Sequence, residues 1–146
     1  MRSSPFFYLA LLPMVLWTST VLASPIDLNA IEHIESSHNP KAWNKRADAR
    51  GLFQITKVVC DEYSSAHSTY GVGNMDLFNG KINKEIAKWY LTKRIPEMLK
   101  SKGYSVTIRN IIVAYNRGIS KVSCKKLPKE TRQYLSKYHK LTSKRG

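Results

Sequence analysis

The chain has 146 residues, with 24 Lys plus Arg against 10 Asp plus Glu, which gives a formal net charge of +14. This length is typical of one domain, and the charged and apolar fractions are those of a globular protein rather than a disordered one. The positive charge favours an anionic partner such as nucleic acid, a membrane surface or an acidic polymer. Two cysteines exclude a disulfide-dense miniprotein and a four-cysteine zinc site.

The N-terminal segment has the composition of a secretory signal peptide. Residues 3–25 carry no charged side chain, Arg2 precedes them, and residues 21–23 (VLA) supply the small residues that a signal peptidase reads. We therefore expect residues 1–23 to be removed on export to the periplasm or the medium, leaving residues 24–146 as one folded domain. The alternative is a retained membrane anchor, because the apolar stretch is almost long enough to span a bilayer. Any membrane contact would be made through this segment alone.

No motif for reading nucleic acid accompanies the basic charge. The sequence contains no zinc-finger spacing, no glycine-rich phosphate loop and no aromatic RNA-binding motif. A lysine cluster over residues 121–144 is typical of a solvated helix face and tail. We therefore expect no nucleic-acid partner, and an acidic polymer of the cell envelope fits the charge better.

Apolar residues recur at helical spacing along most of the chain. Ser24 at the N-cap and Pro25 at the first helical position predict a first helix, which ends before Pro40. Further helices are predicted over residues 57–64, from residue 79 or 80 to a kink at Pro96, over residues 108–118 and from Pro128 onward. No segment alternates with period two for long enough to predict a sheet, so the expected fold is all-α or nearly so.

Glu35 is the most informative side chain of the first predicted helix. Leu28 and Ile31 lead to it at spacings of three and four, which places Glu35 on the apolar face of that helix. Burial there would raise its pKa and keep a proton available near neutrality, as a general acid requires. The alternative is a partly exposed glutamate that pairs with one of the many lysines.

Three other polar side chains could share a cleft with this acid. Gln54 follows a glycine and two large apolar residues, while Tyr115 and Asn116 end an apolar helix. Taken alone, each is explained as well by a helix cap or by core packing. The four histidines show no metal-ligand spacing, so we expect no metal site. Cys60 and Cys124 could pair after export or remain thiols.

Five segments, in this order, resemble the motifs of the soluble lytic transglycosylase (SLT) family. They are residues 34–42 (IESSHNPKA), 49–55 (ARGLFQI), 76–79 (DLFN, followed by Asn83), 113–118 (VAYNRG) and 128–134 (PKETRQY). The resemblance implies a lysozyme-like α fold with a cleft that binds the glycan strands of peptidoglycan. It covers nearly all of the chain that follows the expected signal peptide.

The resemblance also implies roles for individual residues. By position, Glu35 matches the family's catalytic acid and base. Residues that match positions of the family's substrate cleft are Gln54, Tyr115, Asn116 and, more peripherally, Glu130. Asn44 stands near a position where the family often has serine, and we expect it to contact the sugar as well.

The expected reaction is cleavage between N-acetylmuramic acid and N-acetylglucosamine. Between Glu35 and Gln54 the only other acid is Asp48, in an expected exposed loop, so one carboxylate fits better than the usual pair. We expect a 1,6-anhydromuramic product and no cofactor. The alternatives are a hydrolytic muramidase on the same fold and a non-catalytic cationic wall-binding or envelope-assembly protein. A protein with this activity could also be part of an envelope-spanning secretion machine or of a lysis system.

Overall fold

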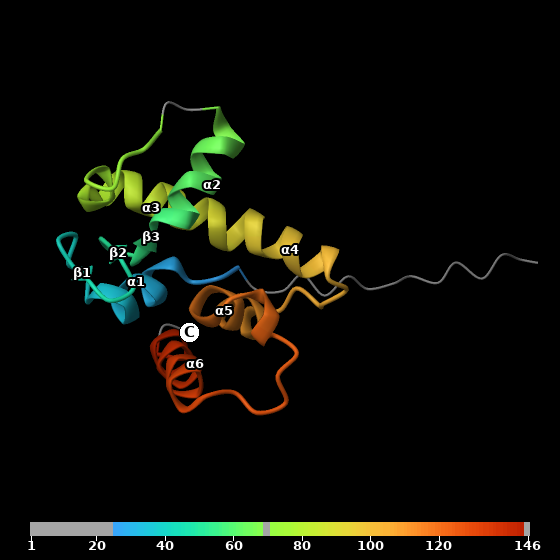
Figure 1. Cartoon of the computed structure of the whole chain (residues 1–146). Helices are drawn as coiled ribbons and strands as arrows, with labels where there is room; N and C mark the ends of the chain where they lie inside the picture. The colour runs from blue at the N-terminus through green and yellow to red at the C-terminus, as the bar shows by residue number, and fades with distance from the viewer. Residues whose placement is uncertain (1–24, 69–70, 145–146) are drawn as a thin grey trace, which may run out of the picture.

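Helices form the framework of the molecule, and a small sheet lies at one end of it (Figure 1). The computed structural model describes residues 25–68 and 71–144, so the expected signal peptide over residues 1–23 lies outside the described residues. The α-helices are α1 (Leu28–Ser36), α2 (Lys57–His67), α3 (Gly80–Trp89), α4 (Ile95–Ser101), α5 (Ile108–Arg117) and α6 (Lys129–Thr142). The prediction of an all-α or nearly all-α fold is confirmed.

The helix α1 begins at a different cap from the one that the sequence predicts. Asp27 is its N-cap, and the side chain accepts a hydrogen bond from the backbone N–H of Ala30 at 3.0 Å. The carboxylate of Asp27 thus binds a backbone N–H group of the first turn that has no partner within the helix. Because Asp27 and not Ser24 caps the helix, the predicted start at Ser24 is wrong. The predicted end before Pro40 is confirmed, because the helix stops at Ser36.

Three very short strands connect α1 with α2. They are β1 (Trp43–Asn44), β2 (Ala49–Arg50) and β3 (Ile55–Thr56), and they form an antiparallel sheet in that order. The sequence analysis missed this sheet because two residues are too few for alternation to be recognised. Gly51 follows β2 with a φ of +77°, and a Cβ there would lie 2.2 Å from the carbonyl oxygen of Leu77, so only glycine fits this turn.

The helices α3 and α4 form one rod through the molecule, joined by the π-helical segment η2 (Tyr90–Arg94) (Figure 1). Asn79 begins the rod, because its side chain accepts hydrogen bonds from the backbone N–H groups of Lys81 and Ile82. Pro96 lacks a backbone donor, and the π-helical segment lies immediately before the turn that contains it. The predicted kink is therefore a π-helical segment, and Tyr90 at its start faces the cavity described below.

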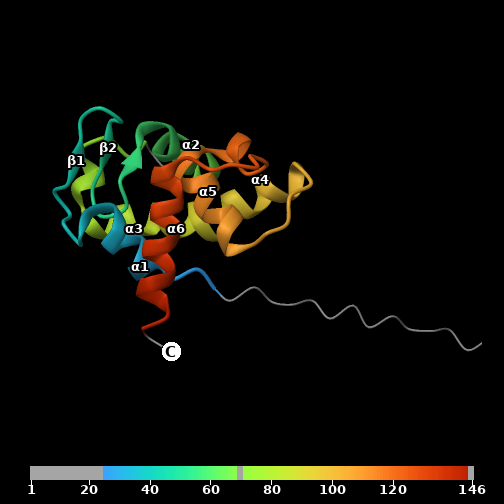
Figure 2. The same ribbon diagram turned by 90° about the horizontal axis from the view of Figure 1, so that it is seen from below.

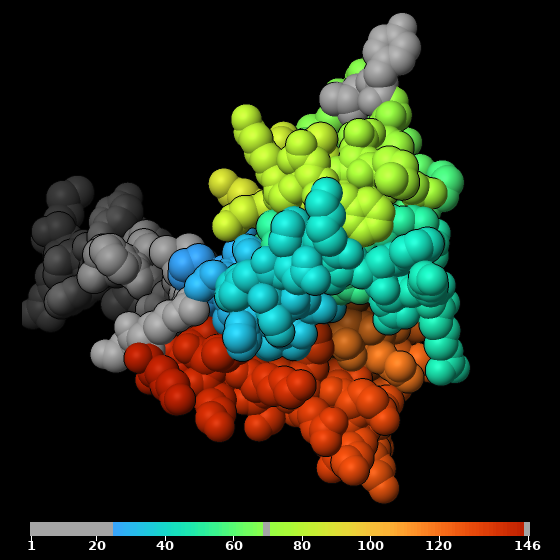
Figure 3. All heavy atoms as spheres, turned by 90° about the vertical axis from the view of Figure 1, so that its left-hand side faces the viewer, coloured from blue at the N-terminus to red at the C-terminus, as the bar shows by residue number. Residues whose placement is uncertain are grey.

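The last helix covers the first one. α6 contacts α1 and α5, and Figure 2 shows it lying across both. The side chains that α6 buries are Thr131, Tyr134 and Tyr138. Seen from the sheet end, the blue-to-cyan atoms of α1 and the strands lie between the yellow-green atoms around α3 and the red atoms of α6 (Figure 3). Within residues 25–68 and 71–144, no helix is both long and apolar enough to cross a bilayer.

Candidate active site

Glu35 lies in the last turn of α1 and faces a cavity of about 430 Å³. Ile31, one turn earlier on the same face, is fully buried, so the helix brings the carboxyl group to the edge of the core. Burial raises the pKa of Glu35 from 4.5 to about 7, because a poorly solvated site disfavours the charged form. Near neutral pH the group is therefore partly protonated, as a general acid requires.

The hydroxyl group of Tyr134, on α6, donates a hydrogen bond of 2.7 Å to Oε1 of Glu35. This bond favours the carboxylate and so partly opposes the effect of burial on the pKa of Glu35. It also fixes the orientation of the carboxyl group. The sequence analysis quoted Tyr134 only as the last residue of the motif PKETRQY and missed this contact.

Most of the predicted site residues line the cavity together with Glu35. They are Asn44 from β1, Gln54 from the turn before β3, and Tyr115 and Asn116 from the end of α5. Glu130 is exposed in the first turn of α6 and is not among the residues that line this cavity. A role for Glu130 in substrate binding stays a prediction. Tyr90 of η2 also lines the cavity, and the sequence analysis did not single it out.

Gln54 is held in a conformation that few residues with a side chain adopt. Its φ is +50°, in the left-handed region. The side-chain Nε2 donates to the carbonyl oxygens of Gly51 at 3.0 Å and Ala42 at 3.3 Å. Both bonds use the amide nitrogen, which leaves Oε1 as an acceptor for a ligand in the cavity.

Tyr115 and Asn116 are each oriented by one hydrogen bond. The hydroxyl of Tyr115 donates to the backbone carbonyl of Phe53 at 2.5 Å, and burial raises the pKa of this phenol, which keeps it neutral. The Oδ1 atom of Asn116 accepts from the hydroxyl of Thr131, a fully buried residue of α6, at 3.0 Å. The Nδ2 group of Asn116 is therefore left as a donor for a ligand.

The fully buried amide of Asn83 holds the turn that carries Gln54. Its Nδ2 donates to the carbonyl oxygens of Arg50 at 2.8 Å and Leu77 at 2.9 Å, while Oδ1 accepts from the backbone N–H of Phe53 at 2.8 Å. The side chain of Asn83 thus forms hydrogen bonds with three backbone groups, two in the turn between Arg50 and Phe53 and one at Leu77. The sequence analysis quoted Asn83 as part of a motif but assigned it no role.

Glu35 is the only carboxylate among the described residues that line the cavity. Asp48, the other acid of the motif region, is exposed and forms an ion pair with Arg50 at 2.6 Å. In the described part of the chain, no group of three or more His, Cys, Asp or Glu is arranged to hold a metal ion. Cys60 and Cys124 are both free thiols in this structure. The cavity therefore combines one protonatable acid with neutral hydrogen-bonding groups.

A family model described as "Transglycosylase SLT domain" matches residues 22–137. The chain belongs to this family. Neither the curated proteins nor the solved structures yielded a match to the chain. Membership of the SLT family confirms the resemblance found in the sequence, and the helical architecture with a small sheet agrees with its lysozyme-like fold. For this family the indicated activity is of the lytic-transglycosylase type, with peptidoglycan as the substrate class.

Proposed function

We propose that the protein is an exported lytic transglycosylase that cleaves the β-1,4 bond between N-acetylmuramic acid and N-acetylglucosamine, with Glu35 as acid and then as base. One observation carries this proposal. Glu35 has a pKa of about 7, and no second carboxylate is found among the described residues that line its cavity. Glycosidases that deliver water or form a covalent intermediate usually need a carboxylate pair. Formation of a 1,6-anhydro ring by the substrate's own C6 hydroxyl group needs only one group, which first donates a proton and then accepts one.

In the first step, protonated Glu35 donates its proton to the glycosidic oxygen, and the bond from that oxygen to C1 of the muramic acid breaks. The substrate's own N-acetyl oxygen stabilises the positive charge that develops at C1. Because Tyr134 donates a hydrogen bond to Glu35, the carboxylate that remains is stabilised as it forms.

In the second step, the carboxylate of Glu35 takes the proton of the C6 hydroxyl group, and the C6 oxygen bonds to C1. The 1,6-anhydro ring closes and Glu35 is protonated again, so the cycle balances without a cofactor. The C6 hydroxyl group is tethered to the reacting ring, and such groups reach effective concentrations on the order of 10⁵ M when they are well aligned. It therefore competes strongly with water.

Neutral groups of the cavity are suited to orient the sugar. Gln54 offers Oε1 as an acceptor and Asn116 offers Nδ2 as a donor. Asn44 is exposed at the rim, where its Oδ1 accepts from the backbone N–H of Ala47 at 3.2 Å, which leaves its Nδ2 for the substrate. The high positive charge of the chain favours encounter with the anionic wall polymer, most strongly at low salt.

The test is a mass analysis of the fragments that the purified protein releases from peptidoglycan. The proposal predicts 1,6-anhydromuramic ends, lighter by about 18 Da than hydrolysed ends because the ring closes internally and no water is added. Digestion in water enriched in heavy oxygen should leave these ends unlabelled. Predominantly reducing, labelled muramic ends would instead make the protein a hydrolytic muramidase.

The variant Glu35→Gln is the control for the acid. The substitution keeps the size of the side chain and removes its ionisable proton, so release of fragments should fall by a factor of about a hundred or more. Circular dichroism should show that the variant folds. If Glu35→Gln cleaves as fast as the wild type, Glu35 has no part in the reaction.

A further inference from the structure

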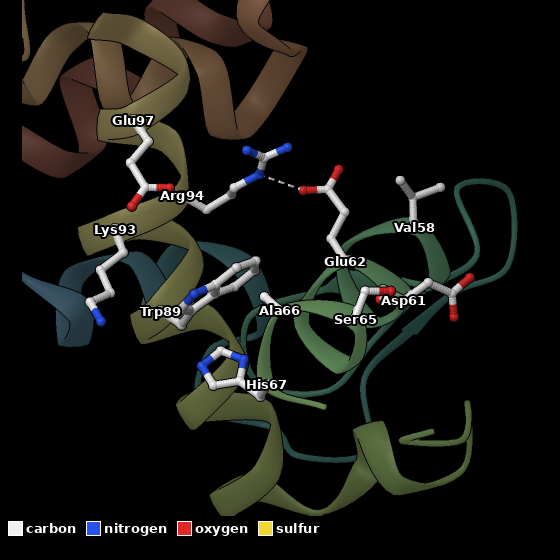
Figure 4. Close-up of a pocket in the computed structure, with 10 residues that line it drawn as sticks. All are labelled: Val58, Asp61, Glu62, Ser65, Ala66, His67, Trp89, Lys93, Arg94 and Glu97. Atoms are coloured by element: carbon white, nitrogen blue, oxygen red, sulfur yellow. Dashed lines mark hydrogen bonds and ion pairs between the residues drawn. The ribbon is translucent and has the colours of Figure 1, made fainter. Parts of the chain in front are cut away.

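A second and larger cavity, of about 890 Å³, lies between α2 and the rod formed by α3, η2 and α4 (Figure 4). Asp61 and Glu62 of α2 line one side, and Lys93, Arg94 and Glu97 of the rod line the other. The volume is in the range of cavities that bind organic ligands. None of these five charged residues takes part in the mechanism proposed for Glu35.

The second cavity adjoins the cavity of Glu35. Val58, which is 67 % exposed, lines both of them. Trp89 lines the second cavity and the next residue, Tyr90, lines the first, with their ring centroids 6.1 Å apart. A ligand seated at Glu35 could therefore extend past Val58 into the second cavity without leaving the surface of the protein.

The charges of the second cavity are of both signs and are only partly paired. The Nε group of Arg94 donates to Oε2 of Glu62 at 2.8 Å across the cavity, and this is the contact that the dashed line in Figure 4 marks between the two side chains. Asp61 pairs with Lys57 within α2. Lys93 and Glu97 form no ion pair within the described residues. The cavity thus keeps two cationic groups and one carboxylate available for a ligand.

This arrangement suits one part of the peptidoglycan substrate. The sugar rings of the glycan carry no positive charge, whereas the short stem peptide attached to each muramic acid carries carboxylates and, where it is not cross-linked, an amino group. Carboxylates are bound well by a guanidinium or ammonium group, and an amino group by a carboxylate. A site with both signs of charge beside the glycan cavity therefore matches the peptide and not the sugars.

We propose that the cavity between α2 and the α3–η2–α4 rod is a subsite for the stem peptide of the same strand that is cleaved at Glu35. Lys93 and the terminal nitrogens of Arg94 bind carboxylates of the peptide, and Glu97 binds its amino group. This inference rests on the proposed function, because it takes peptidoglycan as the polymer bound at Glu35.

The first experiment compares glycan strands that carry stem peptides with the same strands after an amidase has removed the peptides. The variant Lys93→Glu reverses one charge of the cavity. Lys100→Glu is the matched control, because Lys100 is an exposed lysine of α4 outside both cavities. For Lys93→Glu, KM on peptide-bearing strands should rise about three- to tenfold relative to the control, with kcat unchanged. On stripped strands the two variants should not differ. An equal rise of KM on both kinds of strand, or no difference from Lys100→Glu, overturns the subsite.

A binding measurement separates this inference from the proposed function. The released stem peptide is titrated into Glu35→Gln by calorimetry and, in parallel, into the double variant that also carries Lys93→Glu. Saturable binding that weakens in the double variant supports the subsite, and equal binding or none overturns it. Failure of the wild type to cleave either kind of strand would overturn the proposed function, whatever the titration shows of the cavity.

Discussion

The hydroxyl group of Tyr134 lies 2.7 Å from the carboxyl group of Glu35, although 99 positions separate the two residues in the chain. Tyr115, whose side chain lines the cavity of Glu35, donates its hydrogen bond to a backbone carbonyl instead. Tyr134 is therefore the phenol that acts directly on the protonation of Glu35, and it lowers a pKa that burial raises. The acid strength of the site is a balance between these two effects.

The variant Tyr134→Phe should shift the pH dependence of cleavage. In the proposed reaction, cleavage requires protonated Glu35, so activity should be lost as the pH rises through the pKa of this group, about 7. Without the donor the pKa rises further, so the alkaline limb of kcat/KM should move to higher pH, by about one unit at most. A pH–rate profile measures the shift.

Tyr138→Phe is the control, because Tyr138 lies on the same helix and its hydroxyl group accepts a hydrogen bond from the backbone N–H of Asp27. An alkaline limb that moves equally in both variants, or in neither, contradicts the assignment.

Replacing the acid should stabilise the fold at high pH. The pKa of Glu35 is about 7 in the folded protein against 4.5 as the reference, so ionisation costs the folded state more than the unfolded one. Below about pH 4.5 both states hold the proton and the cost is absent, and above about pH 7 it is fully present. Glu35→Gln should therefore gain up to about 3 kcal/mol of unfolding free energy relative to the wild type between these two values. Urea unfolding across this pH range checks the gain. If the difference in unfolding free energy between Glu35→Gln and the wild type does not change with pH, burial does not raise the pKa of Glu35.

Gly51 and Gly103 offer a matched pair of substitutions. Both have a positive φ, +77° and +73°, but a Cβ at Gly51 would meet Leu77 and Asn83, whereas nothing lies within 4 Å at Gly103. Gly103→Ala should cost only the backbone strain, about 1 kcal/mol. Gly51→Ala must also displace the turn before Gln54, which should cost about 3 kcal/mol or more. Thermal unfolding compares the two variants, and similar losses of stability would contradict the crowding at Gly51.

Export is tested on the N-terminus of the mature protein. The charge-free residues 3–25 and the small residues of VLA at 21–23 predict cleavage after Ala23. Material recovered from the periplasm or medium should begin at Ser24 on N-terminal sequencing. An intact chain that begins at Met1 and fractionates with the membrane would support the anchor instead.

Local sequence signals were sufficient for most of the helices. The predicted start at residue 79 or 80 and the predicted end at Gly118 both match helix boundaries in the structure, because the signals at these boundaries act within one turn. The same local logic failed at α1, where Ser24 and Asp27 are both suitable caps and the sequence offers no means of ranking them.

Contacts between distant segments were beyond the sequence analysis. Glu32 is 8 % exposed and pairs with His38 at 2.9 Å and with Lys84 at 3.5 Å. Glutamate is usually exposed, so nothing in the sequence predicted that this side chain is buried. The ordered motifs identified residues that meet in one cavity, but the partner of Glu35 depends on where α6 packs. Such tertiary packing is set by the whole fold rather than by any local pattern.

The hydrogen bond between Tyr134 and Glu35 also has a consequence for the order of biosynthesis. Ribosomes produce α1, with the acid, early in the chain, and α6, with the hydroxyl group that orients it, close to the end. Tyr138 ties the same two helices together a second time, through the backbone of Asp27. A nascent or prematurely terminated chain that lacks α6 therefore contains the acid without its orienting partner. The full set of groups around Glu35 is therefore assembled only when synthesis of the chain is nearly complete.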